Sequence, residues 1–159
     1  MGRITATLLL AGLLTVSSPS RAAATCSAAA GVMMVGYLVT NSLPTDQNVD
    51  LIVTCRRSGG PASITIEVAV GPSQTSNSIA SRKMSSSSSS DLADYNFYRE
   101  VARQSVWGNT SGVNTSTQTL SVPNNSSATS TFTIFGRMPA LQNLTPGTYT
   151  DAVTVSVTP

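Results

Sequence analysis

The chain closes with the stretch FGRMPALQNLTPGTYTDAVTVSVTP, residues 135–159, and the pattern of its second half decides the fold class. From residue 148 onward, apolar side chains alternate with small polar ones, which is typical of a β-strand with one buried face. The alternation places Val153, Val155 and Val157 on one face, and we expect these valines to line the hydrophobic core. The stretch therefore predicts a single closing strand over residues 148–157, whose free edge no later segment of the sequence pairs.

The same alternation recurs upstream at short intervals. Residues 48–55 (NVDLIVTC) and 63–70 (SITIEVAV) carry aliphatic side chains at every second position, and the turn RRSGGP separates them. Residues 71–90 end in a run of serines, and we expect them to form a loop over the sheet edge because they have little apolar area to bury. No long segment has the 3.6-residue period of a helix, so the sequence predicts an all-β sandwich. Further strands are expected at residues 31–40, 117–122 and 130–138.

The first residues have the pattern of an export signal. An early arginine supplies a charged start, residues 4–16 an apolar segment shorter than the roughly 20 residues of a membrane span, and residues 22–24 a run of alanines suited to cleavage. We expect cleavage after Ala24, which makes residues 1–24 a signal peptide and residues 25–159 one exported domain.

Removal of that segment also changes the charge of the protein. The whole chain has nine basic and seven acidic residues, but Arg3 and Arg21 lie in the signal, which leaves seven of each sign. Binding to nucleic acid or to an anionic membrane surface requires clustered lysine and arginine. We therefore expect no nucleic-acid partner and no membrane insertion of the mature chain.

The reactive side chains are few. Cys26 and Cys55 are an even pair in an exported protein, which predicts a disulfide. The chain has no histidine, so we expect neither a metal site nor another cofactor, and the usual serine–histidine catalysis is not available. The single lysine, Lys83, lies among serines and is interpreted as a solvated loop residue, and Asp91 and Asp94 as turn residues. These features predict a protein that is not an enzyme.

Trp107, in the segment SVWGNTSG, has two interpretations. A single tryptophan followed by glycine is most often a buried core residue at a strand end. The alternative is an exposed ring on which a sugar stacks, which makes Trp107 a possible ligand contact.

Two segments, YNFYREVARQSVWGN (residues 95–109) and FGRMPALQNLTPGTYTDAVTVSV (residues 135–157), together with Cys26 and Cys55, resemble the spore coat protein U domain family. That family includes subunits of archaic chaperone-usher pili. The resemblance spans nearly the whole mature chain. It implies an immunoglobulin-like sandwich that lacks its final strand, which a neighbouring subunit supplies in trans.

The resemblance also implies a function and partners. The expected function is that of an exported structural subunit of a surface pilus, fimbria or coat, assembled with a periplasmic chaperone, an outer-membrane usher and other subunits. In this interpretation Val153, Val155 and Val157 line the groove for the donated strand. A cut after Ala24 leaves only Thr25 before Cys26, so we expect the chain to accept a strand but not to donate one. The alternative is a stand-alone carbohydrate-binding or adhesin module.

Overall fold

The protein is built from antiparallel β-strands. The computed structural model describes residues 24–30, 37, 40, 42–60 and 62–159, and within these ranges it contains no helix. The expected strand at residues 31–40 lies almost wholly outside the described residues. The strands are β1 (Ala24–Ala30), β2 (Thr45–Arg57), β3 (Ala62–Ser73), β4 (Arg82–Ser86), β5 (Leu92–Tyr98), β6 (Ser116–Val122), β7 (Ser127–Met138), β8 (Tyr149–Thr150) and β9 (Val153–Thr158).

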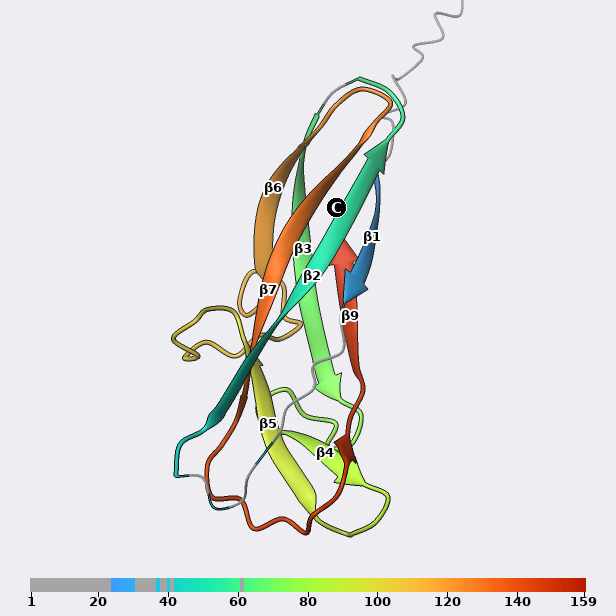
Figure 1. The fold of residues 1–159 in the computed structure, drawn as a ribbon. Helices are drawn as coiled ribbons and strands as arrows, with labels where there is room; N and C mark the ends of the chain where they lie inside the picture. The colour runs from blue at the N-terminus through green and yellow to red at the C-terminus, as the bar shows by residue number, and fades with distance from the viewer. Residues whose placement is uncertain (1–23, 31–36, 38–39, 41, 61) are drawn as a thin grey trace, which may run out of the picture.

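The strands form two sheets that face each other. One is a six-stranded sheet with the order β1-β2-β7-β5-β4-β8, and the other is a three-stranded sheet with the order β6-β3-β9. In Figure 1 the long strands β2 and β7 run beside β3 over the upper part of the molecule, whereas β4 and β5 extend the larger sheet below. The predicted all-β sandwich is confirmed.

The core lies between the two sheets and is formed by every second side chain. The inward side chains of β2 and β3 are almost fully buried, with Val53, Ile66 and Val68 each 0% exposed. Phe132 and Ile134 of β7 complete this cluster from the larger sheet. The alternation that the sequence shows at residues 48–55 and 63–70 therefore corresponds to the core faces of β2 and β3.

The prediction of a loop at residues 71–90 is partly wrong. β3 continues to Ser73, and β4 lies inside the segment, where it pairs with both β5 and β8. The sequence did not predict β4, because its residues (RKMSS) lack the alternation of apolar and polar side chains that marks a strand. Tertiary pairing with β5 stabilises this strand instead.

The prediction of a single closing strand over residues 148–157 is also wrong in one respect. The chain leaves the larger sheet after β8 and joins the smaller sheet as β9, with Asp151 and Ala152 between the two strands. The backbone amide of Gln74 donates to the carbonyl oxygen of Ala152 at 3.1 Å, which holds the crossing point against the end of β3. Because Asp151 lies at this crossing, it does not belong to a continuous strand face.

Candidate functional site

The smaller sheet ends at β9, which pairs with β3 and has no second partner strand among the described residues. The larger sheet ends on the same side of the sandwich at β1, which pairs with β2 alone within the same ranges. Figure 1 shows β1 and β9 close together at this side. The two sheet edges therefore flank one side of the core.

The valines of β9 face the core, as predicted. Val153, Val155 and Val157 all pack against the main core cluster, yet each remains half-buried. By contrast, their partners on β3 are buried: Val68 and Val70, opposite Val157 and Val155, are 0% exposed, and Ser73, opposite Val153, is 1% exposed. The apolar face of β9 is thus covered on the β3 side and incompletely covered on the other.

The predicted disulfide joins the first two strands. Cys26 of β1 lies directly opposite Cys55 of β2 in the strand register, and the two sulfur atoms are bonded. Cys55 is 0% exposed, and Cys26 packs against the same core cluster as the valines of β9. The crosslink therefore fixes the edge strand β1 to the body of the larger sheet.

A buried arginine stabilises the region from which β9 starts. Arg82 of β4 is 0% exposed, and its Nη2 atom donates to the carbonyl oxygens of Val70, Gly71 and Trp107 at 3.0, 2.7 and 2.8 Å. Its Nη1 atom donates to Oδ1 of Asn96 at 2.5 Å. Burial lowers the pKa of Arg82, but a guanidinium remains charged in proteins. Arg82 therefore ties β3, β5 and the loop that carries Trp107 together.

A second, partly buried contact links β5 to the crossing point. The hydroxyl of Tyr95 donates to Oδ2 of Asp151 at 2.6 Å, and the amide and hydroxyl of Thr75 donate to Oδ1. Burial opposes ionisation of Asp151, but these hydrogen bonds outweigh it and lower the pKa of the carboxyl group. Burial, followed by the neighbouring carboxylate, raises the pKa of Tyr95. Asp151 is therefore an ionised acceptor that fixes the start of β9.

Trp107 belongs to the core, as its first interpretation predicts. Its side chain is 1% exposed, packs near the ring of Phe132, and donates from the indole nitrogen to the carbonyl oxygen of Val68 at 3.0 Å. A Cβ atom at the next residue, Gly108, would lie 2.3 Å from the side-chain amide nitrogen of Asn114, so a larger residue there would have to displace the Asn114 side chain. The alternative of an exposed stacking ring does not agree with this position, since the ring has no accessible face.

The short motifs noted in the sequence converge in space. Asn96 and Trp107 both contact Arg82, and Tyr95 binds Asp151, so residues far apart in the chain form two groups of polar contacts, one around Arg82 and one around Asp151. Sequence reasoning missed Arg82, because nothing local distinguishes it from a loop arginine beside Lys83. The arrangement is structural: its side chains are hydrogen-bonded to one another and to the backbone.

The described residues contain neither a metal-binding cluster nor a membrane-spanning helix. Among them, no group of three or more histidine, cysteine, aspartate or glutamate side chains is arranged to hold a metal ion. No helix in the same ranges is long and apolar enough to cross a membrane.

The fold and its contacts define a class of protein: a small, disulfide-linked β-sandwich domain whose distinctive side chains stabilise the fold. A sequence model of the Spore Coat Protein U domain matches residues 10–156, nearly the whole chain, so the chain belongs to the Spore Coat Protein U domain family. Membership of this family supports a structural subunit of the coat or fimbrial type at the cell surface.

The chain is also similar to a curated protein, "Protein U" of Myxococcus xanthus. The two are 34% identical over 77 residues, which make up 48% of this chain and 40% of that protein. The match thus spans less than half of the length of the relative.

Proposed function

We propose that this protein is an exported structural subunit of a surface pilus, fimbria or coat, and that it accepts a β-strand from a neighbouring subunit along β9. The observation that carries the proposal is the half-buried valine face of β9 at an edge of the smaller sheet. An unpaired edge beside incompletely covered apolar side chains favours the addition of a strand, since the new strand pairs its backbone groups and covers the exposed apolar area.

The neighbouring strand β1 supports the same proposal. The disulfide from Cys26 to Cys55 keeps β1 attached to the larger sheet. A strand that enters between β1 and β9 would therefore contact a fixed strand on each side. A donated strand lies about 4.8 Å from β9 when it is hydrogen-bonded to it. In the proposal, residues 1–24 direct export, and a periplasmic chaperone and an outer-membrane usher deliver the subunit to its partners.

The test is a synthetic peptide of alternating valine and threonine, added to the exported protein, with a peptide of the same composition in non-alternating order as its control. A peptide that binds only the folded protein stabilises it by about 2.7 kcal/mol at a hundredfold excess over its dissociation constant. We expect the alternating peptide to raise the melting temperature and the control peptide to leave it unchanged.

Two matched variants locate the binding edge. Val155→Asp places a charge on the core side of β9 and is expected to abolish most of the gain, because the donated strand would bury that charge without a partner. Thr154→Asp places the same charge on the exposed side and is expected to preserve the gain. If the alternating peptide changes neither the melting temperature nor the solubility of the unsubstituted protein, β9 does not accept a strand.

A further inference from the structure

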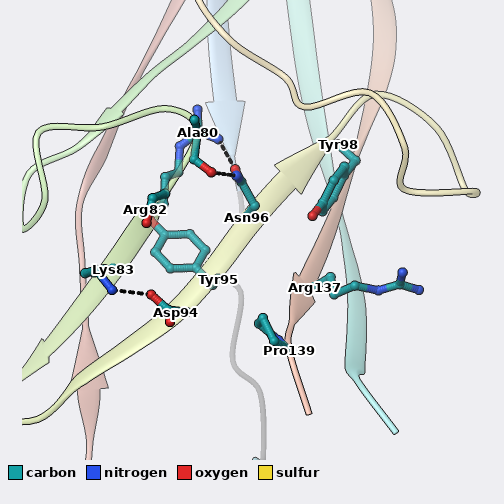
Figure 2. A pocket seen from close by; sticks show the side chains of 10 residues that line it. Ala80, Arg82, Lys83, Asp94, Tyr95, Asn96, Tyr98, Arg137 and Pro139 are labelled. Atoms are coloured by element: carbon teal, nitrogen blue, oxygen red, sulfur yellow. Dashed lines mark hydrogen bonds and ion pairs between the residues drawn. The ribbon is translucent and has the colours of Figure 1, made fainter. Parts of the chain in front are cut away.

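A pocket of about 260 Å³ is lined by side chains of β4, β5 and β7 and by the residues just before β4, outside the valine face of β9. Figure 2 shows it as a depression crossed by β5, with Lys83 and Asp94 on one side and Tyr98 and Pro139 on the other. Neither the disulfide nor the valine face of β9 contributes to its lining.

The strand register explains why polar side chains gather at this place. Along β5, Ala93 and Tyr95 point into the core and are buried, whereas Asp94 and Tyr98 are half-buried and point outward. Asn96 lies between them and is itself buried, because it binds Arg82 and the carbonyl oxygens of Ile79 and Ala80. Lys83 of β4 lies opposite Asp94, and Arg137 of β7 lies opposite Asn96. Three strands thus contribute polar side chains to the same depression.

Two of these side chains form the frame of the pocket. Asn96 is 7% exposed, and its amide nitrogen donates to the carbonyl oxygens of Ile79 and Ala80 at 3.1 and 2.9 Å. The guanidinium of Arg137 extends towards β2, where it binds both carboxylate oxygens of Asp46 at 2.7 and 2.8 Å. Asn96 forms a rigid floor, and Arg137 contributes mainly the stem of its side chain.

The remaining polar groups are free to bind a ligand. Lys83 donates to one carboxylate oxygen of Asp94, which leaves the second oxygen and further ammonium hydrogens available. Within the described part of the chain, the hydroxyl of Tyr98 has no hydrogen-bond partner. The pocket therefore offers a donor, an acceptor and a phenol that can act as either.

We propose that this pocket binds one ring of a neutral sugar. Hydroxyl groups both donate and accept, so neighbouring hydroxyls of a sugar match the Lys83–Asp94 pair. Because the two charges of the pair offset each other, the pair attracts neither an anion nor a cation strongly. The half-buried ring of Tyr98 and the exposed ring of Pro139 supply apolar contacts for the carbon atoms. A volume below the roughly 300–1,000 Å³ of drug-sized sites restricts the occupant to a single small unit. This binding site is independent of the strand-accepting role of β9.

The experiment is a titration of the isotope-labelled, full-length exported protein, followed by backbone amide chemical shifts. The probes are methyl α-D-mannopyranoside, methyl β-D-galactopyranoside and N-acetyl-D-glucosamine, with D-glucuronate as the anionic comparison. We expect saturable shifts at Lys83, Asp94 and Tyr98 for at least one neutral probe, and weaker binding of glucuronate. Absence of saturable shifts with every neutral probe, or tighter binding of glucuronate, would overturn the proposal.

Substitutions test the assigned contacts. Asp94→Asn is expected to weaken binding roughly tenfold, and Tyr98→Phe, which keeps the ring, roughly fivefold. The control Asp50→Asn lies on the exposed face of β2 outside the pocket, and it is expected to bind as the unsubstituted protein does. Ser81→Phe, at an exposed position on the rim, is expected to block the pocket without removing a hydrogen bond of Asp94. This variant replaces Asp94→Asn as the test of the site if Asp94→Asn does not fold. Unchanged affinity in a folded Asp94→Asn variant, or in Ser81→Phe, contradicts the proposed site.

Discussion

Arg82 shows how one side chain can hold several segments together. Its guanidinium is surrounded by backbone carbonyl oxygens and the side-chain oxygen of Asn96, and it lies 5.4 Å from the centre of the Phe97 ring. Removing a buried charge from water is costly, and only a complete set of hydrogen bonds offsets that cost. The fork of an arginine supplies several donors in one plane, which a lysine cannot replace.

We expect Arg82→Met to lower the free energy of unfolding by about 3–5 kcal/mol, because the carbonyl oxygens of Val70, Gly71 and Trp107 lose a donor in a buried site. Urea denaturation of the exported protein measures the change. The control Arg56→Met removes an exposed arginine on β2 and is expected to change stability by less than about 0.5 kcal/mol. Equal denaturation midpoints for Arg82→Met and Arg56→Met would show that the buried network does not stabilise the fold.

At the scale of elements, two edge strands differ in how they are attached. β9 is held by its ladder with β3 and by the contacts of Asp151 at its start. β1 is held by its ladder with β2 and by the disulfide. The covalent link is needed at β1 because a short, alanine-rich strand buries little apolar area.

The double variant Cys26→Ala/Cys55→Ala is expected to lose about 3–4 kcal/mol of stability, from the chain entropy of the unfolded protein without its crosslink. Thermal and urea unfolding measure the loss, and hydrogen exchange is expected to show faster exchange in β1. The matched control is Ser27→Ala/Thr54→Ala, the next opposed pair in the same ladder, which lies outside the crosslink. A double cysteine variant as stable as this control would contradict the role assigned to the disulfide.

At the scale of the whole molecule, five carboxyl groups change the stability of the folded protein with pH in the same direction. Hydrogen bonds or ion pairs lower the pKa of Asp46, Glu67, Asp91, Glu100 and Asp151 in the folded protein. The unfolded chain therefore binds protons at a higher pH than the folded chain does. The stability that these groups contribute is present above their unfolded pKa values, near pH 4, and is lost as the pH falls through the lower folded values.

We expect the melting temperature to be nearly constant from neutral pH to about pH 5 and to fall steeply below about pH 4. Asp151→Asn is expected to lower the melting temperature at pH 7 and to make the acid decrease shallower, because it removes the most buried of these carboxylates. Melting curves between pH 2 and pH 7 provide the measurement, with Asp50→Asn as the control. A parallel acid decrease in the Asp151→Asn variant and the unsubstituted protein would exclude this role of Asp151.

Most of the β-structure could be predicted because it follows from local alternation. Val49, Leu51 and Val53 of β2 and the valines of β9 all face the core as their spacing predicts. The break at Asp151 could not be predicted, since a single polar residue in an alternating stretch is equally compatible with a continuous strand. β4 was missed for a related reason: its pairing partners lie in β5 and β8, beyond the range of local patterns.

The sequence by itself determined the all-β class, the disulfide partners, and which face of each regular strand is buried. These properties depend on the period of the side chains and on the presence of only two cysteines, both of which can be read along the chain. The tertiary structure alone decided that Arg82 is buried, that Tyr95 meets Asp151, and that side chains of three strands share a pocket. Those relations depend on strand order and register between distant segments, because backbone pairing brings together residues that have no pattern in common along the sequence.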